Sequence, residues 1–441
     1  MARDRSRTDD AIRRLADGTV KQRNLLTGTE VWTVPGREHR PLTPPKVDIE
    51  PIDHDKDGHF CAFCQGRYLD TPPEKTRLVL DDDGSWQELG SLRAEQLDDT
   101  VAQFRRIPNL FEIVSYNYWN LNHGHVPSET EHRRMAEYLA SSEGYDHVIN
   151  VVRARMRASG MDEGELAAMD DSALLSYANG FFSGGHDVIV SRRHFTDGAT
   201  HTDQLAGSGT LTPEEHYQYV AFTGRAMADL YGLDPSVKYV SAFQNWLKPA
   251  GASFDHLHKQ LVAIDEHSVQ TEAELTRLRN DPTIYQQILH VGTTRNLILA
   301  RNDHALLMAG FGHRYPSLAI WPLGDAVNPW EAPEEVVRGV SDLLHAAHAA
   351  SGVEVPCNEE WYHRPPDVST PMRWRILLKW RISTIAGFEG GTRIYLNTLD
   401  PWAVSRLVLP RLQELRAQGR IAADLRIGEE VGRISPELLG N

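Results

Sequence analysis

Three polar residues at alternate positions stand out in the segment FQNWLKPAGASFDHLHKQ (243–260), namely His256, His258 and Gln260. Alternate residues of a strand point to the same face, so these side chains would converge. Burying such a triplet costs free energy unless it binds a metal, a phosphate or another polar partner. An imidazole with one unprotonated ring nitrogen is also a nucleophile. The alternative is a solvated strand face in a chain with 20 histidines.

The cysteines suggest a metal site. The chain has only Cys61, Cys64 and Cys357, and an odd trio in a chain this long does not make a disulfide framework. Cys61-Ala-Phe-Cys64 supplies two thiolates one turn apart, which is half of a tetrahedral zinc site. His194, at the end of HDVIVSRRH, and His256 are the histidines in a β context that could complete it. A dithiol redox pair and plain buried cysteines are the alternatives.

Further polar groups lie near this triplet or near a turn, and some of them could contact a phosphate. Asn245 ends the strand before the histidines, and Ser253 follows Gly251 in a stretch whose backbone N–H groups could cradle a phosphoryl oxygen. Arg37 and Arg40 lie three apart in VPGREHRP, and guanidinium groups bind phosphate bidentately. Arginines near a turn are more often ordinary surface residues, so this pair is informative only together with the other motifs.

Composition limits the function classes. The 441 residues, 41% of them hydrophobic, predict two fused units or one large assembly with a sizeable core. The net charge of −15 makes a broad basic face for nucleic acid a poor hypothesis. No signal-like apolar segment and no run of about 18 apolar residues occurs, so we expect a cytoplasmic protein without a membrane partner.

The elements that would position these residues form a weak internal repeat. Two helices are expected to begin at Thr212-Pro213-Glu214-Glu215 and Ala332-Pro333-Glu334-Glu335, each with proline in the first turn and acids at the positive end. A β-like run follows each of these two helices, so each copy of the repeat combines a helix with strands. The alignment places His256 opposite Trp374, His258 opposite Ile376 and Gln260 opposite Leu378. The second copy is therefore predicted to be a scaffold without a catalytic or metal site, with Trp374 and Ile376 packed on the sheet or lining the pocket.

The expected organisation follows from this repeat. LLTGTEVWTVP (25–35) is typical of a strand entered from a tight turn, and folded structure is expected to begin there. The predicted divisions are a polar lead-in (1–20), a first half (21–270) with the zinc knuckle and a helical insert (about 116–178), a degenerate second half (271–424), and an unassigned tail (425–441).

In order and spacing, five segments resemble the successive motifs of the galactose-1-phosphate uridylyltransferase family, a branch of the histidine-triad superfamily. They are RNLLTGTEVWTVPGREHRP (23–41), FCAFCQG (60–66), PNLF (108–111), HDVIVSRRH (186–194) and the segment 243–260. A sixth, IAGFEGGTRIYLNT (385–398), resembles the hexose-site segment, so the likeness spans about 23–410. It implies an α+β fold of two fused histidine-triad-like repeats, with mostly antiparallel sheets flanked by helices.

The resemblance also implies roles for individual residues. It makes His258 the nucleophile that becomes nucleotidylated and Gln260 the donor to the transferred phosphoryl group. The remaining roles are phosphoryl contacts for Asn245 and Ser253, the nucleotide pocket for Asn109 and Phe111, the incoming sugar phosphate for Arg37 and Arg40, the sugar for Phe388 and Glu389, and zinc ligands for Cys61, Cys64, His194 and His256.

Several positions depart from the family pattern. Leu257 and Asp255 stand where family members usually have prolines, and Ser383 stands where a lysine is common. Trp374 and Ile376 replace the second histidine pair, although Glu274 lies near the place of one ligand of a second metal. The sugar and the physiological reaction are therefore left open by the motifs.

The sequence thus predicts a nucleotidyltransferase that moves a nucleoside monophosphate between a nucleotide sugar and a sugar 1-phosphate through nucleotidyl-His258. One structural Zn²⁺ is the expected cofactor, and a homodimer is the expected assembly. A nucleoside diphosphate sugar phosphorylase with the same intermediate and a non-catalytic nucleotide-binding protein are the alternatives.

Overall fold

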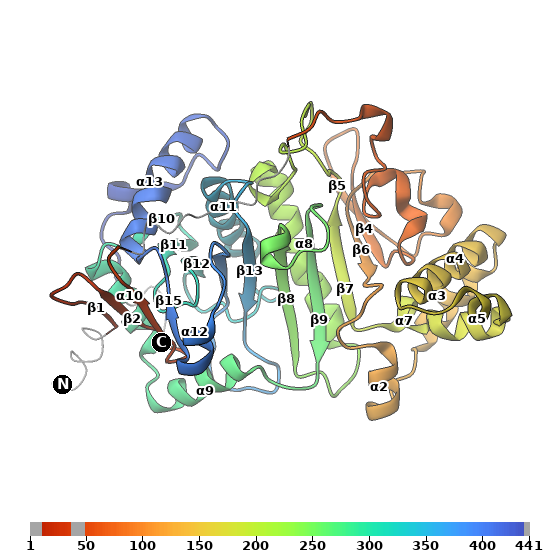
Figure 1. The fold of residues 1–441 in the computed structure, drawn as a ribbon, viewed down its shortest axis with the longest axis horizontal. Coiled ribbons are helices and arrows are strands. Elements are labelled where there is room, and N and C mark those ends of the chain that lie inside the picture. The colour runs from red at the N-terminus through yellow and green to blue at the C-terminus, as the bar shows by residue number, and fades with distance from the viewer. Residues whose placement is uncertain (1–10, 37–48, 436–441) are drawn as a thin grey trace.

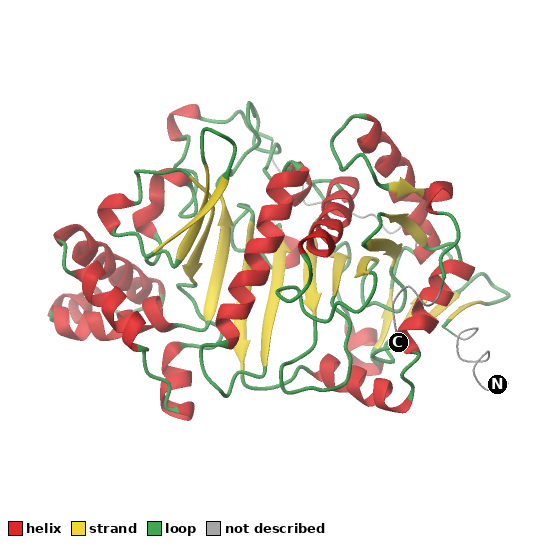
Figure 2. Ribbon diagram, turned by 180° about the vertical axis from the view of Figure 1, so that it is seen from behind, coloured by secondary structure: helices red, strands yellow, loops and turns green. Residues whose placement is uncertain are grey.

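The computed structural model describes residues 11–36 and 49–435. Most of the chain forms one large antiparallel sheet with long helices across one face (Figures 1 and 2). In spatial order its strands are β16 (Arg426–Ile427), β10 (Ile298–Arg301), β11 (Ala305–Ala309), β12 (Ser317–Pro322), β14 (Arg375–Trp380), β13 (Cys357–Tyr362), β8 (Tyr239–Trp246), β9 (His258–Ile264), β7 (His186–Ser191), β6 (Ala102–Pro108), β4 (Thr76–Leu80) and β5 (Trp86–Gly90). The predicted α+β class is confirmed.

The helix–strand–strand unit predicted from the repeat occurs twice. Helix α8 (Pro213–Tyr231) precedes β8 and β9, and helix α11 (Glu334–Ser351) precedes β13 and β14. Strands β8 and β13 pair with each other, so the two units meet in the middle of the sheet. At the start of α8, the Thr212 side chain accepts a hydrogen bond from the Glu215 backbone, as a capping box requires.

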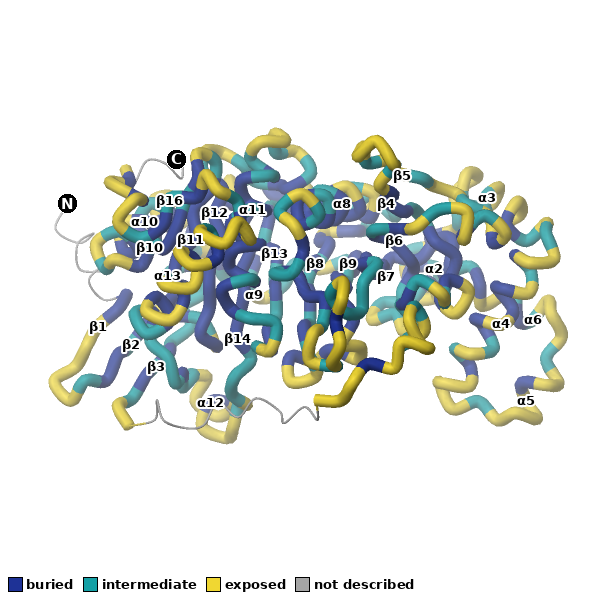
Figure 3. The backbone as a smooth tube through the Cα atoms, turned by 90° about the horizontal axis from the view of Figure 1, so that it is seen from above, coloured by how far each residue is buried: buried dark blue, intermediate teal, exposed yellow. Residues whose placement is uncertain are grey.

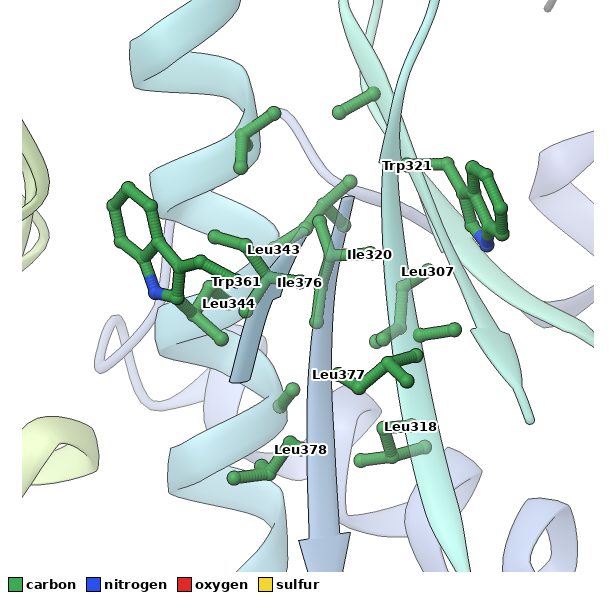
Figure 4. Packing of buried hydrophobic residues seen from close by; sticks show 14 of the residues in the cluster. Leu307, Leu318, Ile320, Trp321, Leu343, Leu344, Trp361, Ile376, Leu377 and Leu378 are labelled. Atoms are coloured by element: carbon green, nitrogen blue, oxygen red, sulfur yellow. The ribbon is translucent and has the colours of Figure 1, made fainter. Parts of the chain in front are cut away.

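The core lies between the sheet and these helices, and the central strands are buried (Figure 3). Ile376 lies beside Leu343 and Leu344 of α11 (Figure 4). Trp374 and Ile376 are fully buried, which confirms that they pack inside the protein. Burial of side chains of this size stabilises the fold by roughly 1.5–3 kcal/mol each.

The insertion between β6 and β7 is helical, as predicted for about 116–178. Ser128 and Glu131 form a capping box at the start of its second helix. The helices are α2 (Tyr116–His123), α3 (Glu129–Leu139), α4 (Ser142–Ala158), α5 (Glu163–Ala168), α6 (Asp171–Leu175) and α7 (Asn179–Ser183), and they gather at one end of the molecule (Figure 1).

A small second sheet joins three strands from the beginning of the chain to one strand of the second half. Its strands are β1 (Ile12–Arg14), β2 (Val20–Arg23), β3 (Glu30–Thr33) and β15 (Ile394–Leu396), of which β15 pairs with β3 in parallel. The expected strand in 25–35 is confirmed as β3, after a turn in which Gly28 has φ 75°. The expectation that folded structure begins there is wrong, because β1 lies within the lead-in. Its charged sequence IRR gives no strand alternation to detect.

The remaining helices belong to the second half of the chain. They are α9 (Val269–Asn280), α10 (Ile284–Thr294), α12 (Gly387–Thr392) and α13 (Pro401–Ala417). The segment 425–441, left unassigned from sequence, contributes edge strand β16. No helix in the described part of the chain has both the length and the apolar character of a membrane span.

Candidate functional site

The four predicted metal ligands come together at one place. Cys61 and Cys64 share a turn, His194 follows β7, and His256 precedes the neighbouring strand β9. Their sulfur and nitrogen atoms all lie within 4.8 Å of one another. The two Sγ atoms are 3.8 Å apart, and the distances from sulfur to the Nδ1 atoms of the two histidines are 3.4–3.8 Å.

These separations fit a tetrahedral ion. Two sulfur ligands at about 2.3 Å and two nitrogen ligands at about 2.0–2.1 Å from a common centre are roughly 3.3–3.8 Å apart. The other ring nitrogen of His256, Nε2, is 2.7 Å from the Ser191 carbonyl, which can only accept, so Nδ1 offers its lone pair to the cluster. The group could therefore hold a metal ion.

His258 is the first residue of β9, and its tautomer is fixed by the backbone. Its Nδ1 donates to the His256 carbonyl at 2.7 Å, which leaves the lone pair on Nε2. Burial lowers the pKa of His258 to about 4, so the imidazole is neutral near pH 7. The Phe63 ring, between the two cysteines of the knuckle, lies 5.2 Å from the imidazole, centroid to centroid. The cluster of two cysteines and two histidines thus supports His258 through the His256 carbonyl and the Phe63 ring.

Gln260 is oriented by a histidine that the sequence reasoning did not select. The Ile113 N–H donates to Nδ1 of His186 at 2.9 Å, so the proton of this imidazole is on Nε2. That Nε2 lies 3.1 Å from Gln260 Oε1. Asn109 Nδ2 is 3.0 Å from the same ring nitrogen and 3.4 Å from the same oxygen, so two donors converge on it. The amide nitrogen of Gln260 is thereby left for a ligand.

His186 stays a neutral donor because burial lowers its pKa to about 4. It opens the quoted motif HDVIVSRRH, so the motif could have indicated it. Its partners Ile113 and Gln260 lie 73 and 74 residues away in sequence, and only the pairing of β7 with β9 brings Gln260 within reach.

A second hydrogen-bonded chain orients Asn245 from the other half of the sheet. Arg381 donates to Asn358 Oδ1 at 2.7 Å, and Asn358 Nδ2 donates to Asn245 Oδ1 at 2.7 Å and to the Ala250 carbonyl at 2.8 Å. Since the oxygen of Asn245 is occupied, its amide nitrogen is the group left for a ligand. Neither Asn358 nor Arg381 was selected from sequence.

The remaining residues predicted to contact the nucleotide or the phosphates differ in how far they are buried and whether the structure describes them. The Asn109 side chain accepts from the Phe111 N–H at 2.8 Å, and Phe111 itself is exposed. Ser253 is exposed in the loop before His256. Arg37 and Arg40 lie outside the described residues, so their predicted role stays a prediction.

The predicted sugar-binding pair lies on α12 beside the small sheet. The Phe388 ring is 6.4 Å from the Trp32 ring of β3. Glu389 is buried, and its Oε2 accepts from the Ala386 N–H at 3.1 Å, which caps its own helix. Within residues 11–36 and 49–435, no hydrogen bond or ion pair joins α12 to His258 or Gln260. Their role with a sugar stays a prediction.

The predicted alignment of the two halves is wrong by one residue. Lys259 contacts Glu359 of β13 at 2.7 Å, and Glu359 pairs with Leu378, so Ile376 and Leu378 share the helix-covered face with Lys259. His258 and Gln260 face the opposite way. A shift by one residue exchanges the two faces of a strand, so the counterparts of His258 and Gln260 are Arg375 and Leu377.

Glu274, noted from sequence as near a second metal position, is engaged by protein groups. Arg375 donates to both of its carboxylate oxygens, at 2.5 and 2.9 Å, and the Tyr285 hydroxyl donates at 2.5 Å. A guanidinium ion thus neutralises the carboxylate on this face of the second half.

The chain is similar in sequence to one protein family and to a curated protein. Residues 15–439 match a family model described as "Domain of unknown function (DUF4921)". An ADP-glucose phosphorylase of Arabidopsis thaliana is 23% identical over 186 residues, which are 39% of this chain and 52% of that protein. The chain therefore spans about half the length of this curated relative.

Two solved structures from Arabidopsis thaliana share the fold. The ADP-glucose phosphorylase with bound ADP-glucose superposes with a TM-score of 0.56 at 18% identity, covering 88% of this chain and 98% of that one. A GalT-like protein gives a TM-score of 0.54 at 17% identity, covering 88% and 97%. The resemblance to the galactose-1-phosphate uridylyltransferase family is confirmed for the fold.

Proposed function

The chain belongs to the family described as Domain of unknown function (DUF4921), and from its site we propose that it is a nucleotidyltransferase acting on nucleotide sugars. In the first step, Nε2 of His258 attacks the α-phosphorus. A P–N bond forms, the bond to the bridging oxygen breaks, and the sugar phosphate leaves with the electron pair. In the second step, a phosphate oxygen of the acceptor attacks the nucleotidyl-histidine and restores the free imidazole.

The hydrogen bond from His258 Nδ1 to the His256 carbonyl carries this proposal. An imidazole can attack phosphorus only through a ring nitrogen with a free lone pair, and this bond leaves the lone pair on Nε2. When Nε2 becomes bonded to phosphorus, the imidazole acquires positive charge, and the carbonyl at Nδ1 stabilises that charge.

Other side chains would stabilise the charge on the phosphoryl oxygens. The amide nitrogens of Gln260 and Asn245 are left free by their oriented oxygens, and fixed donors of this kind need no reorganisation during reaction. Ser253 would add a hydroxyl donor, and Arg37 and Arg40 would hold the phosphate of the incoming sugar phosphate. Asn109 and Phe111 would border the nucleotide.

We assign the metal cluster to one Zn²⁺ with a structural role. Two thiolates and two imidazoles suit zinc, and four protein ligands leave no open coordination position for a substrate. When bound, zinc would fix the loop that carries His256 and hence the carbonyl that orients His258.

A phosphorylase is the second candidate, because the curated relative is an ADP-glucose phosphorylase. The first step would be the same, and inorganic phosphate would take the nucleotide from His258 in the second. The two reactions differ in the acceptor alone. Supplying the nucleotidylated protein with sugar 1-phosphates or with inorganic phosphate, and identifying the products, separates them.

The proposal is tested by incubating the protein with UDP-, ADP- and GDP-sugars that carry radiolabel in the α-phosphate. We expect acid-labile, base-stable label on the protein with at least one of them, as a phosphoramidate requires. A protein that binds these compounds and never becomes labelled would instead be the non-catalytic nucleotide-binding protein.

A further inference from the structure

A groove crosses the centre of the sheet on the face that carries His258. It lies over β8 and β13, where the two halves meet. Its floor consists of half-buried side chains at alternate positions of the two strands, Ser241, Phe243 and Asn245 from β8 and Asn358, Glu360 and Tyr362 from β13. The segment Ser268–Gln270, at the start of α9, forms part of its wall. Alternate residues of paired strands share a face, so these groups point into one space.

The groove begins beside the reaction centre. Phe243 pairs directly with Gln260 of β9, and Asn245 is the next residue of β8 on the same face. A nucleotide sugar whose α-phosphate lay between Asn245, Gln260 and His258 would place its β-phosphate at the Asn245 end of the groove and its sugar ring farther along it.

Glu360 provides a fixed acceptor in the groove. Its Oε2 accepts from the Lys379 ammonium and lies within hydrogen-bond distance of the Tyr362 hydroxyl, both at 2.5 Å. These contacts hold the carboxylate in place. Among the contacts of the described residues, Oε1 of Glu360 has no partner, so a ligand hydroxyl could donate to it. The Glu360 side chain is 31% exposed, whereas that of Lys379 is 8% exposed.

The end of the groove at Asn245 and Asn358 offers donors. The guanidinium of Arg381 is held by Asn358 and lies over the Tyr315 ring, 4.7 Å from its centroid. Its Nε is buried and has no hydrogen-bond partner within the described part of the chain. An unsatisfied buried donor is costly, and a ligand oxygen would satisfy it.

This combination of groups suits a sugar ring. Sugar hydroxyls both donate and accept, so they can use the free carboxylate oxygen of Glu360 and the free N–H of Arg381. The apolar C–H face of a sugar can pack on the rings of Phe243 and Tyr362. The β-phosphate that precedes the sugar ring is disfavoured beside the carboxylate of Glu360 and is expected at the Asn245 end of the groove, where Arg381 lies.

We propose that this groove is the subsite for the sugar ring of the nucleotide sugar and of the acceptor sugar phosphate. The inference rests on the proposed function, because it takes the phosphate position from His258 and Gln260. It assigns sugar recognition to Glu360 and not to Glu389, because the Glu389 carboxylate caps its own helix. Glu360 lies on β13, within the second half of the chain.

The test compares ligands with and without a sugar phosphate, in the His258→Ala background so that no nucleotide is transferred. Affinities for ADP-glucose, UDP-glucose, AMP and UMP are measured by calorimetry for this protein and after adding Glu360→Gln or Ser241→Leu. The matched control is Glu354→Gln, whose carboxylate is 61% exposed and does not line the groove.

We expect Glu360→Gln to weaken the nucleotide sugar roughly tenfold to hundredfold, as loss of a hydrogen bond to a charged group predicts, and to leave AMP and UMP unchanged. Ser241→Leu fills the groove and should also weaken binding of the nucleotide sugar. Glu354→Gln should leave the affinity for every ligand unchanged. If both groove variants keep the parent affinity, or weaken AMP and UMP equally, the groove is not the sugar subsite. If labelling of His258 in the wild type succeeds despite that result, only the subsite is overturned. If the wild type binds no nucleotide sugar, both proposals fail.

Discussion

The two halves of the sheet present different chemistry on the same face. In the first half, His258 and Gln260 are neutral groups oriented by the backbone and by His186. In the second half, Arg375 and Lys379 are bound in ion pairs with Glu274 and Glu360. The scaffold of helix and paired strands is the same in both.

Burial explains why neutral groups in the first half and ion pairs in the second half suit different tasks. A buried charge is stable only when it is paired, and a paired cation has no lone pair with which to attack phosphorus. A buried neutral histidine needs a single fixed hydrogen bond and keeps its second nitrogen free. The first half therefore suits covalent chemistry, and the second suits support and substrate contact.

The halves are joined on the opposite, helix-covered face. Lys259 of β9 and Glu359 of β13 form an ion pair at 2.7 Å in which both side chains are fully buried. His348 of α11 bonds the second oxygen of Glu359 at 2.7 Å, and Gln244 accepts from Lys259 at 3.1 Å. The residue next to His258 is thus tied directly to the second half.

The largest expected effect concerns the proposed zinc site, whose four candidate ligands all lie in the first half. We expect about one zinc per chain in the wild type and nearly none in Cys61→Ser or Cys64→Ser, because each loses one of four ligands. Elemental analysis measures this. Cys357→Ser is the matched control, since this buried cysteine lies outside the cluster and its replacement should keep the zinc. Equal zinc in all variants, or a metal-free wild type of full stability, would refute the site.

The second-largest effect concerns the ion pair of Arg375 and Glu274, which lies on the face of the second half that corresponds to His258 and Gln260 in the first. Arg375→Met leaves the Glu274 carboxylate buried without its cation, and we expect it to lower the free energy of unfolding by about 3–5 kcal/mol. Replacing both Arg375 and Glu274 by apolar residues should lower the free energy of unfolding much less. Denaturant titration measures the free energy of unfolding of the single and the double variant. The exposed pair of Arg416 and Glu430 is the control, where breaking the pair should change the free energy of unfolding far less, because solvent screens an exposed pair. Equal effects at the two pairs would contradict the account.

The third effect concerns His186, which we expect to act through Gln260. His186→Phe should slow nucleotidyl transfer roughly tenfold to hundredfold, because the Gln260 amide loses its orienting donor. In a Gln260→Ala background the same substitution should cost little more, since there is no amide left to orient. Nitrogen NMR of the wild type should show the Nε2–H tautomer of His186. Fully additive losses, or the other tautomer, would show that His186 does not act in this way.

The smallest effect is a pH dependence confined to the second half. Counting from Pro213 and Pro333, Asp342 in α11 takes the position of buried Phe222 in α8. Burial, with the nearby Asp424, raises the pKa of Asp342 to about 7. In the unfolded chain it is about 3.9. The folded state then holds the proton more tightly, so the stability that this carboxyl contributes falls as pH rises from about 4 to about 7.

Replacing this carboxyl tests the sign of that dependence. Asp342→Asn mimics the protonated form and should raise the free energy of unfolding by about 1–2 kcal/mol at pH 8, with little change near pH 4, after allowance for partial exposure. Urea titrations at the two pH values measure the difference. A variant that is stabilised more at pH 4 than at pH 8 would contradict the assignment.

Part of the site could be predicted from sequence because its signals are local. The spacing of His256, His258 and Gln260 and that of Cys61 and Cys64 are set within a few residues, so one strand and one turn suffice to place them. Asn358 and Glu360 carry no such signal, and His186, although it opens a motif, gives no local sign of its partners. Their partners are brought to them by strand pairing between distant segments, which sequence alone does not specify.

The one-residue error in the second half has a similar physical origin. Strand β14, RILLKW, is buried at every position, so it lacks the alternation of polar and apolar residues that reveals which residues share a face. Without that alternation, Ile376 and Arg375 are equally good counterparts of His258. The pairing with β13 decides between them.

The central claim, that His258 alone carries the nucleotide, is tested most directly by mapping the covalent adduct. Wild type incubated with a reactive nucleotide sugar should gain the mass of one nucleoside monophosphate, located on the peptide that contains His258. His258→Ala should gain none, and His54→Ala, which removes an exposed histidine, should behave as wild type. Undiminished adduct in His258→Ala, or an adduct on another residue, would contradict the account.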